Sequence, residues 1–296
     1  IKHNSEVFDL PIVKGTENEI GINIQQLRSK TNLITLDPGF KNTGSCKSAI
    51  TFLDGENGIL RYRGYSIESL AKNASFLEVA YLLIFGDLPS KNELDKLIND
   101  IQDNAIIDED LKKILDSFPR SAHPMGILSS LTSALIAFNP EKKISLSNID
   151  KNKSEIFLYN TIVKLLAKIP ILVSWVHRRR KGLSLDYGDF RNGYVENITR
   201  MMFQLPNQTY IQNNVVVNAM NKLLILHADH EQNCSTSTVR IVGSSEASLF
   251  ASVSAGISAL WGRLHGGANQ AVIEMLEAIK NDNGDTKKYM KKAKDK

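Results

Sequence analysis

The sequence predicts a mostly α-helical protein with a small β-rich region at its N-terminus. From Ser66 onward, apolar residues recur at spacings of three and four, which is the period of helices that pack on one face. Before Ser66, residues 49–53 and 59–62 are expected to form strands, since turn signals such as Asp54-Gly55 and Asn57-Gly58 follow or separate them. The helical part shows neither strand–helix–strand alternation nor an internal repeat, which argues against an α/β fold and a repeat fold.

Two capping boxes mark helix starts in the first helical part. In this motif a serine side chain accepts a backbone hydrogen bond, and a glutamate three residues later accepts one in return. Ser75 with Glu78 opens a helix that Gly86 ends, and Ser90 with Glu93 opens the next. Further helices are expected at 66–70, 108–118, 124–138, 154–169, 194–203 and 215–226.

Proline and the basic residues divide the middle of the chain. Pro170 is expected to end the helix that starts at Ser154, because proline lacks the N–H that a helix needs. Residues 177–193 are then the longest expected loop, a candidate lid or interface element.

His123, just before Pro124, is expected to be a structural residue at a helix start. Alanines every four residues give the helix of residues 247–259 a flat face, which predicts close helix packing.

Composition and charge limit the function classes. With 296 residues, 42% apolar and 23% charged, the chain can bury a full core and resembles soluble globular proteins. Its net charge of +4 is concentrated in residues 178–181 and 281–296. Because the pI of 8.9 is modest, we expect these runs to be solvated or to contact ligand phosphates or a neighbouring subunit, not nucleic acid.

The cysteines and apolar runs indicate a reducing compartment without a membrane span. Cys46 and Cys234 lie far apart, with no disulfide framework spacing. The longest apolar stretches, at 169–176 and 249–261, are shorter than the ~20 residues that a transmembrane helix needs.

A short segment from His227 to Asn233 concentrates polar residues directly after an apolar run. Two imidazoles, two carboxylates and two amides in seven residues favour a functional site over an ordinary polar helix end. On a helix, His227, His230 and Glu231 would share a face and could bind one ligand. These three could also bind zinc, although their spacing is neither His-Glu-x-x-His nor its inverse.

A second cluster, His265-Gly266-Gly267, precedes a segment whose apolar residues follow the helical period to Ile279. Near a helix start, unpaired N–H groups and the helix dipole keep an imidazole neutral. A neutral imidazole can donate a hydrogen bond to an oxygen that gains charge, as in an enolate. The two glycines would let a ligand approach the backbone.

These motifs resemble those of the citrate synthase family, in its bacterial members. The resemblance covers His227 to Arg240 and Leu264 to Asn269, and it extends along the chain in the right order. The further motifs are at 36–40, 45–46, 50–52, 54–55, 58–60, 63–65 and 123–125. The resemblance implies a citrate synthase-like multi-helical large domain. Residues 1–65 would be its β-rich N-terminal segment, 66–276 its helical part, and 277–296 the start of a small domain.

Members of the family condense acetyl-CoA with oxaloacetate to citrate and CoA in the tricarboxylic acid cycle. The resemblance therefore implies an acyltransferase with acetyl-CoA as a substrate, and neither a cofactor nor a metal. It assigns to His265 the catalytic hydrogen bond to the thioester oxygen, and to His230 the binding of oxaloacetate. The same substrate site would include His227, Asn233, Gly266 and Gly267.

The resemblance also implies a cytoplasmic homodimer or hexamer. The family's second catalytic histidine, its catalytic aspartate and its carboxylate-binding arginines come later in the chain, after the position of Lys296. We therefore expect residues 1–296 to be a partial chain that is inactive by itself. Arg263, where many members have proline, is a departure close to the predicted site.

Three alternatives stay open. A 2-methylcitrate synthase would differ in accepting propionyl-CoA. A zinc-dependent hydrolase would use His227, His230 and Glu231 as ligands. A non-catalytic binding module would need neither chemistry.

Overall fold

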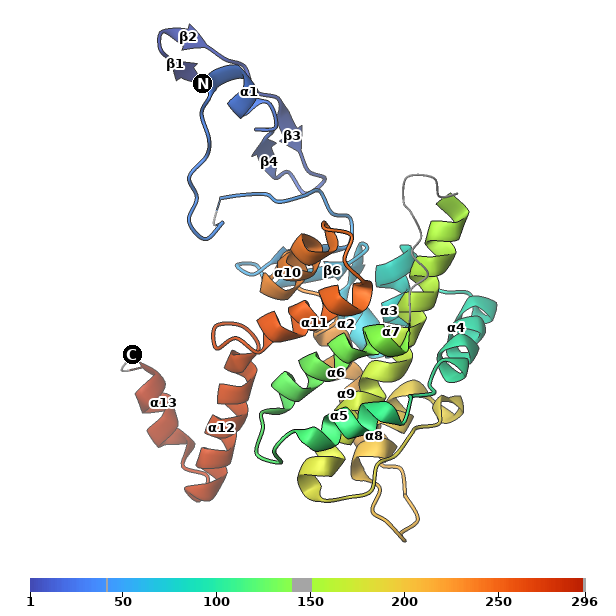
Figure 1. Cartoon of the computed structure of the whole chain (residues 1–296). Coiled ribbons are helices and arrows are strands. Elements are labelled where there is room, and N and C mark those ends of the chain that lie inside the picture. Colours follow the sequence, from blue (N-terminus) through green and yellow to red (C-terminus); the bar gives the residue numbers. More distant parts are fainter. Residues whose placement is uncertain (41, 140–150, 295–296) are drawn as a thin grey trace. The chain divides into compact units, whose positions relative to one another are not determined.

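The computed structural model describes residues 1–40, 42–139 and 151–294 (Figure 1). These residues contain thirteen α-helices and seven short strands, which confirms the predicted mostly α fold class. Of the expected segment 277–296, the last two residues lie outside the described residues. Contacts divide the chain into two units, Ile1–Ala49 and Ile50–Lys296. The domain division expected from the sequence stays a prediction.

The first unit consists of two antiparallel hairpins and one short helix. Strand β1 (Lys2–His3) pairs with β2 (Glu6–Val7), β3 (Ile12–Lys14) pairs with β4 (Ile20–Ile22), and α1 (Leu27–Thr31) follows. Such hairpins are marginally stable in water unless other elements cover them. Large apolar side chains of this unit are nevertheless exposed, among them Val7, Ile12, Ile20, Ile22, Ile34 and Leu36.

The second unit begins with a three-stranded antiparallel sheet. Strands β5 (Thr51–Asp54), β6 (Ile59–Tyr62) and β7 (Tyr65–Ser66) lie in this order, so the two strands expected from the sequence are formed. Helix α2 (Ile67–Asn73) follows, with Ser66 as its N-cap.

Both capping boxes form as the sequence predicts. Ser75 and Glu78 cap α3 (Phe76–Phe85), and Ser90 and Glu93 cap α4 (Lys91–Asp103). Gly86 adopts a φ of 105° at the end of α3, a left-handed conformation that favours glycine. These signals are local, which is why the sequence alone located them.

The remaining helices include one long helix, α7, which lies in the main core. They are α5 (Asp110–Ser117), α6 (Pro124–Phe138), α7 (Lys151–Lys181), α8 (Tyr194–Phe203), α9 (Asn214–Leu226), α10 (Cys234–Gly243), α11 (Leu249–Leu260), α12 (Gly267–Asn281) and α13 (Thr286–Lys294). The main core cluster includes fully buried Leu131, Leu135, Leu172 and Trp175. In contrast, α12 and α13 contain no buried residue among those described.

Helix α7 runs through Pro170, so the prediction that this proline ends the helix is wrong. Proline has no N–H, and the carbonyl of Leu166 one turn earlier therefore loses its helical partner. The Tyr194 hydroxyl, from α8, donates to that carbonyl at 2.8 Å. Burial raises the pKa of Tyr194, which keeps the hydroxyl protonated as the donor. A side chain from another helix thus replaces the missing backbone donor.

The expected loop at 177–193 is also wrong in its first part, because residues 177–181 continue α7. Two arginines of the basic run are structural and are not on a solvated face. Arg178 is buried and donates to the carbonyls of Met201 and Gln204 at 2.9 and 2.8 Å. Arg179 donates to two further carbonyls, those of Asp116 and Phe118.

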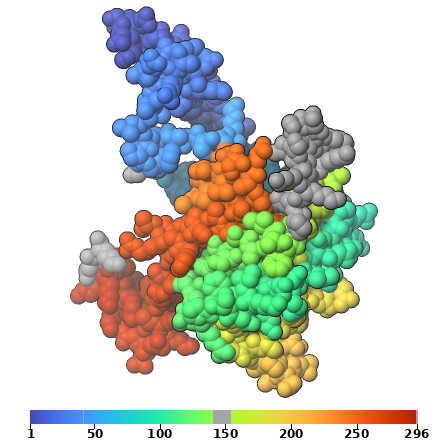
Figure 2. All heavy atoms as spheres, viewed as in Figure 1, coloured from blue at the N-terminus to red at the C-terminus, as the bar shows by residue number. Residues whose placement is uncertain are grey.

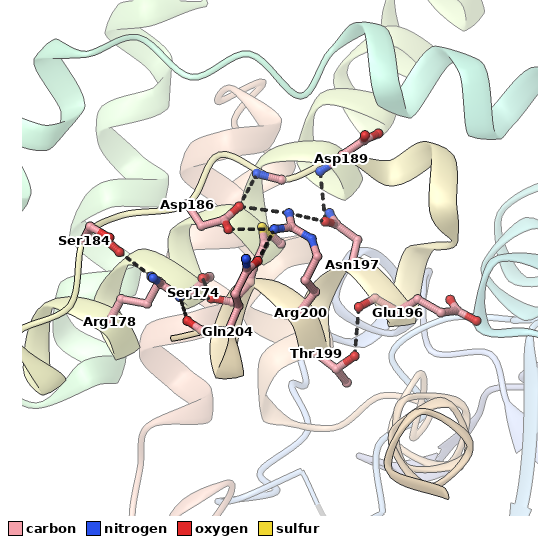
Figure 3. A network of polar contacts seen from close by, with 12 residues as sticks. Ser174, Arg178, Ser184, Asp186, Asp189, Glu196, Asn197, Thr199, Arg200 and Gln204 are labelled. Carbon is pink, nitrogen blue, oxygen red and sulfur yellow. Dashed lines mark hydrogen bonds and ion pairs between the residues drawn. The ribbon is translucent and has the colours of Figure 1, made fainter. Parts of the chain in front are cut away.

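A polar network fixes the loop after α7 onto α8 (Figure 3). Asp186 accepts two hydrogen bonds from the Arg200 guanidinium, at 2.8 and 3.0 Å. Arg200 also donates to the side chains of Asn197 and Gln204. Burial alone would raise the pKa of Asp186, but the bonds from Arg200 and the Gly188 amide lower it. The loop is therefore held by charged groups, which argues against a mobile lid.

Among the described residues, the part of α7 from Ser154 to Lys181 is long and apolar enough to cross a membrane by length and composition. The sequence did not predict this because the helix was expected to stop at Pro170. Buried residues along it, such as Val163, Ile171 and Trp175, belong to the protein core. A core helix passes the same length and composition test.

Lys168, on α7, supplies a pH-dependent contribution to stability. Its side chain is only 7% exposed, and its ammonium donates to the carbonyl of Ile106. Burial, with a smaller contribution from Lys164, lowers the pKa of Lys168 to about 8.

We predict that the free energy of unfolding rises with pH between about 8 and 10.5 in the wild type, relative to Lys168→Met. Over this range the unfolded chain binds a proton that the folded chain has released. The pKa difference corresponds to about 3 kcal/mol, and below pH 8 the full cost of burying the charge remains. Urea denaturation of the wild type and of Lys168→Met at pH 7, 8.5 and ~10 measures the difference in their free energies of unfolding. A difference that stays constant across this range would contradict the prediction.

Candidate active site

Helix α11 packs closely against both α6 and α10 (Figure 1), and this packing positions the candidate site. Figure 2 shows the green atoms of α6 in contact with the orange atoms of α11. The alanine face expected from the sequence is only half-buried. The buried residues of α11 are instead Phe250, Ser252, Ser254 and Gly256. Their spacing of two places Phe250 and Ser254 on one side of the helix and Ser252 and Gly256 on the other.

Glycine and serine let the three helices approach. A Cβ added to Gly256 would lie 2.6 Å from Val239 Cγ2 on α10, a distance that real Cβ atoms do not adopt. Towards α6, Ser254 donates to the Ser129 carbonyl at 2.8 Å, and Ser129 donates to the Ser254 carbonyl at 3.0 Å. Small residues therefore fix the position of α10 and α6 relative to α11.

The turn between α11 and α12 carries His265, just ahead of α12, where the sequence places it. The amides of Gly266 and Gly267 donate to the carbonyls of Leu260 and Gly262, at 2.9 and 3.1 Å. A Cβ on Gly266 would lie 2.5 Å from the Leu260 oxygen, and one on Gly267 would lie 3.0 Å from the Gly262 oxygen. Both glycines are thus required by the turn itself, since neither has a positive φ.

His265 is paired with Ser235, which the sequence analysis did not single out. Nε2 of the half-buried His265 lies 2.9 Å from Ser235 Oγ, in the first turn of α10. The same hydroxyl lies 3.1 Å from the Gly256 carbonyl and has one hydrogen for the two acceptors. When Ser235 donates to Nε2, the proton of a neutral ring is on Nδ1, which can then donate to a ligand oxygen.

The polar segment from His227 to Asn233 is not helical, so its histidines do not share a helix face. Helix α9 ends at Leu226, and His227 is its C-cap. Nδ1 of His227 lies 2.8 Å from the Leu223 carbonyl, and Nε2 of His230 lies 3.3 Å from the Leu226 carbonyl. Because a carbonyl only accepts, each ring donates from the nitrogen named, and its second nitrogen remains outside these bonds.

The three residues proposed as zinc ligands have different partners. Glu231 adopts a φ of 56°, and its carboxylate accepts a hydrogen bond from the Leu53 amide at 3.1 Å. Across the described residues, no group of three or more His, Cys, Asp or Glu side chains is placed to hold a metal ion. The His227, His230 and Glu231 set of the zinc hydrolase alternative therefore does not converge.

Asn233 joins the two predicted clusters. Its side-chain oxygen accepts from the Thr236 amide at 2.9 Å, which makes Asn233 the N-cap of α10. Ser235, two residues later, contacts His265. The start of α10 therefore connects the segment from His227 to Asn233, the histidine segment, to the His265 turn.

His123 is a structural residue, as the sequence predicts. It is the N-cap of α6, its Nε2 lies 3.2 Å from Gln270 Oε1, and its ring stacks on Trp261. A cavity of 540 Å³ lies beside this contact. It is lined by Ser121, His123, Pro124, Met125, Arg180, Leu260, Trp261, Gly266, Gly267, Asn269 and Gln270.

Comparisons with known proteins show the family of the chain. A family model described as the C-terminal domain of citrate synthase matches residues 39–296. The chain is 47% identical to a citrate synthase of Corynebacterium glutamicum over 290 residues, which are 98% of this chain. It is also 47% identical to citrate synthase 1 of Mycobacterium tuberculosis over 287 residues, or 97% of this chain.

The chain belongs to the citrate synthase family. This confirms the resemblance seen in the sequence motifs. The chain spans 65% of the length of each of these two relatives.

Solved structures share the family's fold. A citrate synthase from Thermoplasma acidophilum, in a ternary complex with carboxymethyl coenzyme A and oxaloacetate, superposes with a TM-score of 0.73 at 25% identity. The match covers 83% of this chain and 61% of that one. Citrate synthase from Pyrobaculum aerophilum gives a TM-score of 0.69 at 28% identity and covers 91% and 63%.

We predict that Gly256→Ala destabilises the protein by about 1–3 kcal/mol, because the added methyl overlaps Val239. Urea denaturation measures this loss. In a double-mutant cycle, Val239→Ala should remove the overlap, so that the double variant loses less than the sum of the two single variants. Additive losses would contradict the proposed contact.

Proposed function

We propose that the protein acts as a citrate synthase, condensing acetyl-CoA with oxaloacetate to give citrate and CoA. One observation carries the proposal: a histidine paired with a serine sits in a tight Gly-Gly turn, in a chain 47% identical to citrate synthases. The ligands of the Thermoplasma relative, carboxymethyl coenzyme A and oxaloacetate, support these two substrates.

The first step makes acetyl-CoA a nucleophile. A base takes a proton from the methyl carbon, and the electron pair moves to the thioester oxygen, which gains charge. His265 donates a hydrogen bond to that oxygen from Nδ1, which requires the Ser235 hydroxyl to donate to Nε2 in place of the Gly256 carbonyl. A donor already fixed before the charge develops lowers the barrier without reorganising.

The second step forms a carbon–carbon bond. The enolate carbon attacks the keto carbon of oxaloacetate, and the keto oxygen takes a proton. Water then adds to the thioester carbon and CoA leaves with the proton, so that citrate is released. His230, with His227 and Asn233, binds oxaloacetate. In the imidazolium form, the ring nitrogens that do not bond to the Leu223 and Leu226 carbonyls carry a second N–H, and such groups pair well with carboxylates, as the Asn233 amide does. Gly266 and Gly267 contribute by presenting no side chain, since both amides already bond to carbonyls.

We also propose that the chain forms a cytoplasmic homo-oligomer. The apolar side chains exposed on the N-terminal hairpins support this part of the proposal. Elements this small need cover to be stable, and a second copy of the chain would provide it.

Calorimetric titration of oxaloacetate tests the proposed function. We expect heat of binding with the wild type, and a Kd at least about tenfold weaker with His230→Ala, since the variant loses a donor to a carboxylate. His177→Ala, at a histidine on α7 whose ring contacts Phe203, serves as the control and should bind normally. Stoichiometric zinc uptake without oxaloacetate binding would contradict the proposal and favour a metal site.

A further inference from the structure

Tyr62, the last residue of β6, is completely buried beneath the histidine segment. Its hydroxyl oxygen lies 3.1 Å from the Ile225 carbonyl, 3.0 Å from the Asp229 carbonyl and 3.2 Å from the Asp229 amide. Burial raises the pKa of Tyr62, so the hydroxyl remains a donor. A single side chain from the sheet thus meets two main-chain groups of Asp229 and one at the end of α9.

The three contacts agree with the bonding capacity of one hydroxyl. It accepts from the Asp229 N–H and donates its hydrogen to one of the two carbonyls. Ile225 lies in the last turn of α9, and its carbonyl also accepts from the Ala228 amide at 3.2 Å. Asp229 directly precedes His230. The hydroxyl therefore joins the end of α9 to the backbone that carries His230.

A second hydrogen bond from the sheet holds Glu231, the residue that follows His230. The Glu231 carboxylate accepts from the amide of Leu53, on the strand paired with β6. Asp229 Oδ2 accepts from the Glu231 amide at 3.1 Å and so links the residues on either side. The β5–β6 hairpin therefore holds both neighbours of His230, while the exposed imidazole itself bonds to the Leu226 carbonyl at the end of α9.

We propose that Tyr62 is a positioning residue for His230: its buried hydroxyl sets the backbone of Asp229 and, through it, the place of the imidazole that binds oxaloacetate. The inference rests on the function proposed for His230. Phenylalanine would fill the same volume but would leave a buried amide and two carbonyls without this partner, so the segment would relax.

The test compares Tyr62→Phe with Tyr194→Phe. Tyr194 is a matched control, because it too is a buried tyrosine whose hydroxyl donates to a main-chain carbonyl, but it belongs to the other core cluster. Both variants are expected to lower the melting temperature. Only Tyr62→Phe is expected to shift the ring resonances of His230 in spectra of 15N-histidine-labelled protein, assigned with His230→Gln.

Only Tyr62→Phe is also expected to weaken oxaloacetate binding, by about tenfold, the scale of one lost buried hydrogen bond. If Tyr62→Phe leaves both the His230 resonances and the oxaloacetate affinity at wild-type values, the positioning role is wrong. If both variants shift His230 equally, the effect is general loss of stability and the proposal also fails. If the wild type binds no oxaloacetate, the proposed function fails, and the His230 resonances still decide the role of Tyr62.

Discussion

The candidate site depends on the close crossing of α10 and α11 at Gly256. Only a residue without a Cβ allows Val239 and the first turn of α10 to come this near to α11. That approach brings Ser235 within 2.9 Å of Nε2 on His265. The tight turn after α11 supplies the other half of the pair, because Gly266 folds against the Leu260 carbonyl. Backbone packing, and not a chain of polar side chains, thus sets the geometry at His265.

The backbone of the histidine segment is held in place in a different way. Its backbone leaves the helical conformation after α9, and a sheet from the start of the second unit supports it. Tyr62 and Leu53 reach Asp229 and Glu231 across more than 160 positions of sequence, with separations of 167 and 178. This long-range support explains why a β-rich region lies in an otherwise helical protein.

Sequence patterns predicted the features that depend on neighbouring residues. The capping boxes at Ser75 and Ser90, the helix end at Gly86 and the position of His265 before α12 follow from local hydrogen bonds and helical period. The family motifs also identified both histidine clusters. Each of these signals lies within a few residues of the structure that it specifies.

What the sequence did not predict depends on contacts between distant segments. Pro170 stays within α7 because the Tyr194 hydroxyl donates to the Leu166 carbonyl, and no local sequence pattern predicts that hydrogen bond. The sequence did not identify Ser235, which lies in a run of small residues, because its contact with His265 forms only when α11 packs against α10. The spacing of His227 and His230 predicts one helix face, but the segment after Leu226 is not helical, and both rings bond to carbonyls of α9, those of Leu223 and Leu226.

The most direct test of this account is the tautomer of His265, read from 15N chemical shifts of histidine-labelled protein. The proposed function requires neutral His265 to carry its proton on Nδ1 in the wild type, with Ser235 donating to Nε2 and not to the Gly256 carbonyl. Ser235→Ala should then lose this preference. Gly256→Ala should weaken the preference as well, since it moves α10 away from α11. A wild-type ring protonated on Nε2, or a tautomer unchanged by Ser235→Ala, would contradict the account.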